Sequence, residues 1–226
     1  MQIVTVKTST EYPIIIGMNI LKTLGENVKK YCSSGTAVIV TDDIVYELYG
    51  KICEESIAKS GYNTEMIIIK NGESSKNAKE YIRILNILAE KKVTRTDCLI
   101  ALGGGVVGDL TGFVAATYLR GIKFVQVPTT LLAAVDSSVG GKTGIDLDSG
   151  KNLAGAFYQP AFVLCDYSTL KTLPQKVLCD GCAEVIKYGI IRDKKLFYMM
   201  QDNEHLNLEE IITRCVKIKA EIVNED

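Results

Sequence analysis

A glycine-rich stretch near the middle of the chain separates an apolar run from a helical pattern. Gly103, Gly105 and Gly108 satisfy the spacing G-x-G-x-x-G directly after the apolar segment 98–102. Glycines without Cβ atoms let a backbone approach a pyrophosphate closely, and the first amides of a helix carry unpaired N–H groups and a partial positive charge. The strand–turn–helix context therefore predicts a dinucleotide phosphate site rather than a plain tight turn.

The acidic residue that usually binds ribose hydroxyls about 20 residues after such a loop is absent. Asp136 is the first acid after the predicted helix, whereas Asp42 ends an earlier apolar run, 37–41. The glycine loop also lies outside the first strand–helix unit of the chain. The pattern therefore predicts a Rossmann-like site rather than the standard one, with Asp42 as the candidate ribose ligand.

Two lysines beside glycines follow the next apolar run, 124–127. Lys142 follows Gly140 and Gly141, and Lys151 follows Gly150, with Asp136 and Asn152 nearby in sequence. A lysine ammonium is a flexible point charge suited to phosphate or carboxylate. We expect these lysines to lie in loops that bind an anionic ligand at the carboxyl edge of the sheet, with solvated hairpin loops as the alternative.

Few residues of the chain suit a metal ion or a nucleophile. Glu184 and Lys187 lie three apart on one helical face, which fits an ordinary salt bridge or a metal-binding carboxylate beside a phosphate-binding lysine. Cys179 and Cys182 form a C-x-x-C, which we interpret as a coincidence, with redox or metal chemistry as the alternative, because zinc needs about four ligands. The single histidine, His205, excludes a multi-histidine cluster within these residues, and we expect it in a solvated loop.

The segments that must position these residues alternate between apolar strands and amphipathic helices. Segments 2–7 and 12–16 predict a β-hairpin, and a helix after Ser74 or Ser75 carries an apolar stripe at i, i+3, i+4 and i+7. Strands that are apolar throughout favour a parallel sheet covered on both faces. The fold class we predict is α/β, a Rossmann-like parallel sheet with flanking helices.

Helical patterns dominate beyond Asp166, at about 175–193 and 208–223. We expect residues 1–173 to form the NAD-binding domain and residues 174–226 to begin a mainly helical C-terminal domain. The last helix runs into residues 224–226 without a capping glycine, so we expect this second domain to be incomplete.

Composition narrows the function classes. The 226 residues are 47% hydrophobic and 23% charged with a formal net charge of −1, which argues against general nucleic-acid binding and an electrostatic membrane anchor. No apolar run approaches the ~20 residues of a membrane span, and the N-terminus lacks a signal-peptide core. Seven scattered cysteines indicate reduced, mostly buried thiols. We expect a soluble cytoplasmic enzyme.

Four stretches, 103–121, 126–146, 150–160 and 181–189, resemble the 3-dehydroquinate synthase family of sugar-phosphate cyclases, and 71–76 resembles it more loosely. The resemblance implies a lyase of the shikimate pathway of aromatic amino acid biosynthesis. Such an enzyme converts 3-deoxy-D-arabino-heptulosonate 7-phosphate to 3-dehydroquinate and phosphate. NAD is reduced and restored in each turnover, because oxidising one alcohol acidifies the neighbouring C–H and lets phosphate leave. A divalent metal, zinc or cobalt, acts as Lewis acid.

The resemblance also implies the cofactor contacts. Asp42 would bind the adenosine ribose, and Thr129 and Thr130 would contact the nicotinamide end. The remaining implied residues line the nucleotide, hold the pyrophosphate or close the adenosine side; they are Asn71, Gly72, Glu73, Ser74, Ser75, Lys76, Gly104, Gly105, Val106, Val107, Gly108, Asp109, Thr169, Leu170, Lys171 and Thr172.

The substrate and metal residues follow from the same resemblance. Lys142, Asn152, Asp136 and Lys187 would bind the substrate, and Lys151 would lie between substrate and cofactor, so that Lys142 and Lys151 also count among the cofactor residues. Glu184 would be one metal ligand. Arg120 would reach the phosphate on the neighbouring subunit, which implies a homodimer that binds a small sugar acid phosphate and neither nucleic acid nor membrane.

Family members continue past residue 226 and carry two metal-binding histidines there. We therefore expect this chain alone to lack full metal coordination and to be inactive. Three alternatives stay open: a cyclase that makes an inosose or valiolone-type ring, a polyol dehydrogenase of the glycerol dehydrogenase type that releases NADH, and a non-catalytic nucleotide-binding module. The string from Asp136 to Lys142 favours dehydroquinate synthase over the other cyclases.

Overall fold

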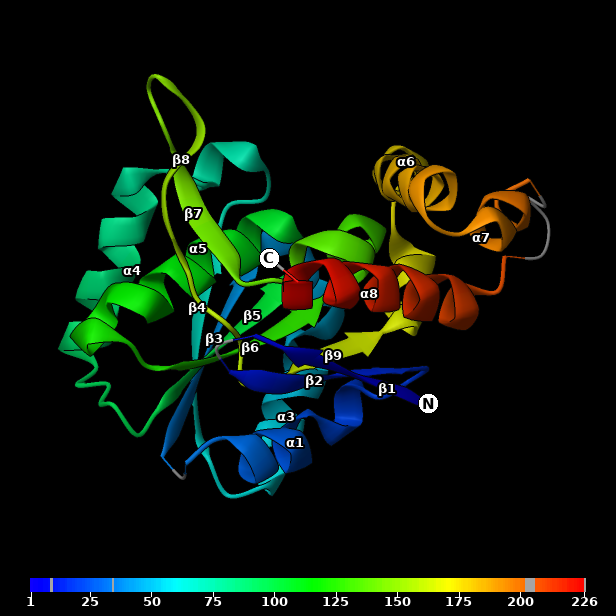
Figure 1. Ribbon diagram of the computed structural model, residues 1–226. Helices are drawn as coiled ribbons and strands as arrows, with labels where there is room; N and C mark the ends of the chain where they lie inside the picture. The colour runs from blue at the N-terminus through cyan, green and yellow to red at the C-terminus, as the bar shows by residue number, and fades with distance from the viewer. Residues whose placement is uncertain (9, 34, 202–205, 226) are drawn as a thin grey trace.

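The computed structural model describes residues 1–8, 10–33, 35–201 and 206–225. Its centre is a seven-stranded sheet in the order β1-β2-β9-β6-β5-β3-β4 (Figure 1). All pairings in this sheet are parallel except that of β1 with β2. The strands are β1 Gln2–Lys7, β2 Glu11–Gly17, β3 Thr36–Asp42, β4 Asn63–Ile69, β5 Cys98–Gly103, β6 Lys123–Pro128 and β9 Val163–Asp166. The predicted Rossmann-like α/β fold and the N-terminal hairpin are confirmed.

Helices cover both faces of the sheet (Figure 1). One face packs on α1 (Leu24–Tyr31) and α3 (Lys51–Lys59), and the other on α4 (Ala78–Glu90) and α5 (Gly105–Thr117). Successive strand residues point to opposite faces of the sheet. The side chain of Ile39 therefore packs with the apolar residues on the face of α1 and α3, and that of Val40 packs with those on the face of α4 and α5. Burial on both faces is why these strands are apolar throughout.

The residue that caps α4 differs from the prediction. Neither Ser74 nor Ser75 caps the helix, because both lie in a 3-10 turn, Glu73–Ser75. The cap is Asn77, whose side chain accepts a hydrogen bond from the amide of Glu80 at 2.9 Å. Asparagine is as good an N-cap as serine, and the intervening turn places the cap two residues after Ser75.

A second, two-stranded sheet stands where loops were expected. Lys142 is the first residue of β7 (Lys142–Leu147), and Lys151 is the second residue of β8 (Gly150–Phe157), so the prediction of loops was wrong. Gly144 and Gly155 are cross-strand partners, and a Cβ on Gly155 would lie 2.0 Å from the carbonyl oxygen of Thr143. These glycines weaken the strand pattern in the sequence, yet they allow the two strands to approach.

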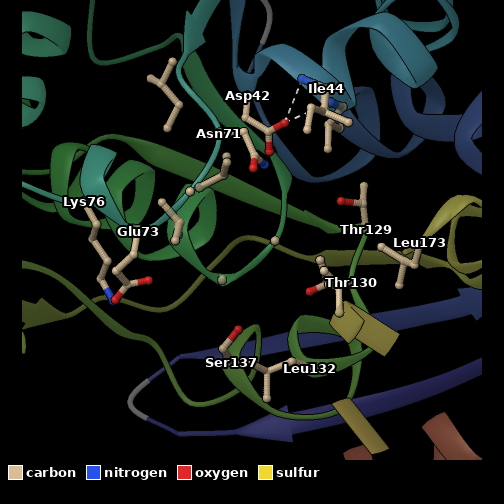
Figure 2. A pocket seen from close by; sticks show the side chains of 18 of the residues that line it. Asp42, Ile44, Asn71, Glu73, Lys76, Thr129, Thr130, Leu132, Ser137 and Leu173 are labelled. Atoms are coloured by element: carbon tan, nitrogen blue, oxygen red, sulfur yellow. Dashed lines mark hydrogen bonds between the residues drawn. The ribbon is translucent and has the colours of Figure 1, made fainter. Parts of the chain in front are cut away.

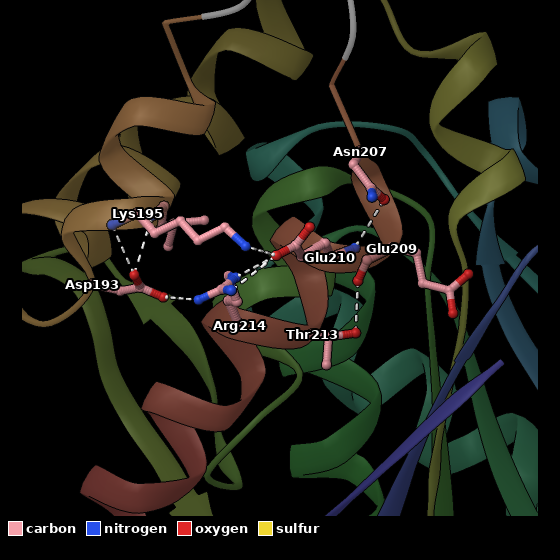
Figure 3. Close-up of polar contacts among 8 residues, drawn as sticks. Asp193, Lys195, Asn207, Glu209, Glu210, Thr213 and Arg214 are labelled. Atoms are coloured by element: carbon pink, nitrogen blue, oxygen red, sulfur yellow. Dashed lines mark hydrogen bonds and ion pairs between the residues drawn. The ribbon is translucent and has the colours of Figure 1, made fainter.

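The C-terminal part is helical, as predicted, with α6 Gln175–Ile191, α7 Lys194–Met199 and α8 Leu208–Glu225. Helix α8 lies along β1 and shares an apolar core with β1 and β2 (Figure 1). Arg214 on α8 joins Asp193, which caps α7, to Glu210 (Figure 3). The division between 173 and 174 stays a prediction, and His205 lies outside the described residues.

The cysteines follow the expected pattern in the described part of the chain. All seven are free, five are buried, Cys179 is exposed and Cys182 is half-buried. No helix of this part has the length and apolar character that a membrane span needs.

Gly181 sets the position of α6. A Cβ at this residue would lie 2.5 Å from the Cβ of Leu131 and 2.7 Å from the amide nitrogen of Leu132. We expect Gly181→Ala to lower the free energy of unfolding by roughly 1–2 kcal/mol, because overpacking outweighs the better helix propensity of alanine. Cys179→Ala on the exposed side of α6 should stay within about 0.5 kcal/mol. Urea unfolding measures both, and equal stabilities would contradict the close contact.

Candidate functional site

Four strands of the large sheet end at one cavity of about 470 Å³ (Figure 2). Asp42 ends β3, Asn71 follows β4, Gly104 follows β5 and Thr129 follows β6. The carboxyl edge of an open parallel sheet is where such folds bind their ligands. The cavity is therefore in the place that the sequence predicts for a dinucleotide.

The glycine loop forms one wall of this cavity. A Cβ on Gly103 would lie 2.6 Å from Cγ2 of Val107, and one on Gly104 would lie 2.9 Å from Cγ2 of Thr130. Neither glycine has a positive φ, so room rather than backbone conformation requires glycine here. The first turn of α5 contains no acidic residue, and its unpaired amides leave a positive helix end suited to a phosphate.

Two further groups fit a nucleotide. Oδ1 of Asp42 accepts hydrogen bonds from the amides of Ile44 and Val45 at 3.1 and 2.9 Å, which leaves Oδ2 for a ribose hydroxyl (Figure 2). The Oγ1 of Thr129 is buried and has no hydrogen-bond partner among the described residues, although Thr129 lines the cavity. A buried hydroxyl without a partner is costly, and a bound ligand would satisfy it.

A second cavity of about 470 Å³ adjoins the first. Its lining includes Asp136, Lys142, Asn152 and Lys219, and the two cavities share Asp109, Ser137 and Asn152. Lys142 is exposed at the start of β7. Two lysines and a half-buried carboxylate in one lining make this cavity suitable for an anionic ligand with several hydroxyl groups.

Asp136 is held by groups from two helices. Tyr188 of α6 and Lys219 of α8 both donate to its Oδ1, the latter at 2.9 Å. Burial alone would raise the pKa of Asp136, but these hydrogen bonds and the nearby ammonium groups together hold it below its ordinary value. The carboxylate is therefore ionised at neutral pH.

Glu184 and Lys187 form an ion pair on α6, which is the simpler of the two expected arrangements. The ammonium lies 4.7 Å from the ring centroid of Tyr188. Burial opposes its charge, but Glu184 and Asp136 outweigh that effect and raise the pKa of Lys187. Within the described residues no three potential ligands gather around Glu184, so these residues alone do not form a metal site.

The predicted cofactor residues divide into two groups. Those that line the first cavity are Asp42, Asn71, Gly72, Glu73, Lys76, Gly104, Gly105, Val106, Val107, Asp109, Thr129, Thr130 and Thr172. Those that do not are Ser74, Ser75, Gly108, Lys142, Lys151, Thr169, Leu170 and Lys171. Gly108 packs on Gln126, and Thr169 is buried with its hydroxyl bonded to the carbonyl of Asp166.

Three predicted substrate residues, Asp136, Lys142 and Asn152, meet in the second cavity. Lys187 lies outside its lining but acts on Asp136 through its charge. Lys151 pairs with Glu73 of the nucleotide loop at 3.3 Å. Arg120 is exposed and lines neither cavity.

Sequence reasoning missed several residues of the site. Tyr49 lines the first cavity, and its hydroxyl lies 2.6 Å from Oγ1 of Thr172. Lys219 reaches Asp136 from a helix 83 positions away in sequence. No local pattern separates either residue from an ordinary helix surface, because only the packing of distant helices brings them to the site.

The ionised state of Asp136 gives a pH-dependent prediction. The pKa of this carboxyl is lower in the folded protein than its ordinary value, so its stabilisation is present above that value and is lost as pH falls through the folded pKa. We expect Asp136→Asn to cost roughly 1–3 kcal/mol at pH 7, with a smaller difference from wild type below about pH 4. Urea titrations at both pH values measure this, and a difference that does not change with pH would refute it.

Comparison with known proteins identifies relatives that match most of the chain. The family model described as 3-dehydroquinate synthase N-terminal matches residues 66–180, and the one described as 3-dehydroquinate synthase C-terminal matches residues 181–226. The chain is 48% identical over 220 residues to the 3-dehydroquinate synthase of Clostridium acetobutylicum, covering 95% of this chain and 62% of that relative. The chain thus spans about 62% of the length of this curated relative.

Solved structures share the fold. A 2-deoxy-scyllo-inosose synthase superposes with a TM-score of 0.88 at 25% identity, over 99% of this chain and 65% of that one. The 2-epi-5-epi-valiolone synthase of Streptomyces hygroscopicus, solved with NAD⁺ and Zn²⁺ bound, gives 0.84 at 25% identity, over 95% and 61%. Because the N-terminal family model alone matches just over half of its residues, the chain belongs to the 3-dehydroquinate synthase family.

Proposed function

We propose that the chain acts in the synthesis of 3-dehydroquinate from 3-deoxy-D-arabino-heptulosonate 7-phosphate, with release of phosphate. The observation that carries this proposal is the junction of the two cavities. A cavity that fits a dinucleotide adjoins one with lysine ammonium groups, and Asp109, Ser137 and Asn152 line both. A substrate in the second cavity is then next to the end of a cofactor in the first.

The residues present fit NAD. We assign the pyrophosphate to the start of α5, a ribose hydroxyl to the free oxygen of Asp42, and the nicotinamide end to Thr129 and Thr130. When bound, NAD would supply reversible hydride acceptance from a substrate alcohol, so that the reaction would have no net oxidation. Lys142 and Lys219 bind the anionic groups of the substrate, and Asp136 orients Lys219 through their ion pair.

We include a divalent metal, zinc or cobalt, in the proposal because of the relatives alone. The valiolone synthase, for example, was solved with Zn²⁺. Glu184 is the one residue that we assign to such a metal. Its carboxylate is tied to Lys187, and the described residues bring no group of three potential ligands to it. The proposed chemistry therefore rests on the residues of the two cavities and assigns no step to a metal.

A homodimer in the cytoplasm completes the proposal. Arg120 is exposed and lines neither cavity, which fits a role at the site of a neighbouring subunit. The adjoining hairpin exposes large apolar side chains, Leu153 at 59% and Phe157 at 79%. A second copy that covered these side chains would remove their apolar surface from water.

Identity favours dehydroquinate synthesis over the alternatives. Relatives named 3-dehydroquinate synthase are 44–48% identical to the chain, whereas the inosose and valiolone synthases are 25% identical. A polyol dehydrogenase would release NADH, and a non-catalytic module would bind NAD without turnover. Phosphate release and NADH absorbance, measured together, separate these outcomes.

The test measures phosphate release from the seven-carbon substrate with NAD and Zn²⁺. We expect the 226-residue chain to bind NAD without turnover, because its described residues bring no group of three potential metal ligands to Glu184. A chain extended by the C-terminal portion of the Clostridium acetobutylicum relative should release phosphate with no accumulation of NADH. Net NADH production would favour a dehydrogenase, and steady release by the 226-residue chain would overturn the expectation about the metal.

Asp42 provides a test on the chain itself. We expect Asp42→Asn to weaken NAD binding roughly tenfold and to reduce discrimination against NADP, because the carboxylate that accepts from ribose becomes a neutral amide. The helix cap survives, since Asn caps as well as Asp. Calorimetric titration with NAD and NADP measures both affinities, and unfolding by urea is the control for the cap. An unchanged NAD affinity would remove Asp42 from the site.

A further inference from the structure

Lys76 is a charged residue with an unusually enclosed side chain. It is 5% exposed, although its ammonium reaches the boundary between the two cavities. Its Nζ donates to Oδ2 of Asp109 and to Oδ1 of Asn152, both at 2.5 Å. Since a buried ammonium is tolerated only when it is paired and hydrogen-bonded, these two contacts determine where it lies.

Both partners of Lys76 line both cavities. Asp109 comes from α5, Asn152 from β8, and Lys76 itself follows the turn Glu73–Ser75. The ammonium therefore joins the nucleotide loop, the phosphate-binding helix and the β7–β8 hairpin at one point. This point is the wall that separates the proposed cofactor from the proposed substrate.

Two further hydrogen bonds, both donated by backbone amides, link Lys76 and Asn152 through Asp146. The amide of Asp146 donates to the carbonyl of Lys76 at 2.8 Å, and the amide of Asn152 donates to Oδ1 of Asp146 at 2.8 Å. Asn152 has a φ of 57°, in the left-handed region that asparagine tolerates better than most residues. Main-chain and side-chain bonds thus hold Asn152 in one conformation.

The chemistry of the two side chains fixes the orientation of the Asn152 amide. A lysine ammonium has three donors and no acceptor, so the amide must turn its oxygen toward Lys76. The Nδ2 group then points to the other side of the planar amide. Asn152 is exposed and lines both cavities, so this NH₂ group is available to a ligand.

We propose that Lys76 is a positioning residue that holds the Asn152 amide with its Nδ2 donors facing the junction of the two cavities. The junction then accepts a ligand only where the ligand presents a hydrogen-bond acceptor, such as a hydroxyl, phosphate or carboxylate oxygen of the substrate. The identity of that ligand rests on the proposed function, whereas the orientation of the amide does not.

Nuclear magnetic resonance of the ¹⁵N-labelled chain tests the orientation directly. The Asn152 side-chain signals are identified by their loss in Asn152→Asp. We expect Lys76→Met to move them toward the position of a free amide, because the amide then rotates without its oxygen being held. Lys79→Met, which changes an exposed lysine on α4, should leave them in place.

Unmoved Asn152 signals in a folded Lys76→Met protein would overturn the proposal. If that variant does not fold, Lys76→Gln is measured in the same way. Glutamine has an NH₂ donor but no charge, so we expect a smaller displacement of the same signals, and no displacement would again overturn the proposal. The backbone signals of each variant report whether it is folded.

Calorimetry with 3-deoxy-D-arabino-heptulosonate 7-phosphate in the presence of NAD supplies a second readout. We expect Lys76→Met to weaken binding of the substrate roughly tenfold, about the loss of one hydrogen bond, and Lys79→Met to leave it unchanged. Equal substrate affinities in wild type and Lys76→Met would count against the proposal. No binding of substrate to the wild-type chain would instead count against the proposed function, and the resonance signals would still decide the role of Lys76.

Discussion

The site depends on two glycines on one face of α5, Gly108 and Gly112, which let the helix pack closely on its neighbours. A Cβ would lie 2.6 Å from Gln126 at Gly108 and 2.4 Å from Thr143 at Gly112. The helix therefore touches β6 at Gly108 and β7 at Gly112 with almost no gap. This contact places the amino end of α5 in the first cavity and brings Asp109 into both. A larger residue at Gly112 would press on Thr143 of β7, and so on the hairpin that lines the second cavity.

Most of the charged side chains in and beside the site form ion pairs. Lys76 lies on Asp109, Lys219 on Asp136, and Lys187 on Glu184. An unpaired ammonium would be costly for the buried Lys76 and the partly buried Lys219, so Asp109 and Asp136 keep these two lysines in place before a ligand arrives. An anionic ligand in the second cavity would then meet groups that are already oriented, together with Lys142, which is exposed at the start of β7. These side chains lose their conformational freedom when the protein folds, so ordering them costs little further entropy when a ligand binds.

Local features of the sequence predicted much of this arrangement, and distant contacts account for the rest. The glycine loop and the uniformly apolar strands depend on residues next to one another, so spacing alone indicated them. The sequence did not predict the β7–β8 hairpin that carries Lys142 and Lys151. Gly144 and Gly155 permit its strands to pair, but they also weaken the sequence pattern by which a strand is recognised. Asn77 replaced serine as a cap for reasons of turn geometry, and Lys219 reaches Asp136 only through the packing of α8. These contacts lie in the tertiary structure, where a one-dimensional pattern carries no signal.

The strand order of the large sheet also governs when the fold can form. The first hairpin pairs with β9, so that Ile14 lies opposite Val163, and β9 in turn adjoins β6. A two-stranded hairpin is at best marginally stable in water, and closing so long a loop is slow. During synthesis from the N-terminus, β1 and β2 therefore wait for residues 163–166, while the edge of β6 stays unpaired. Completion of the sheet is a late step, and the nascent chain exposes an apolar strand edge to chaperones and to other chains until then.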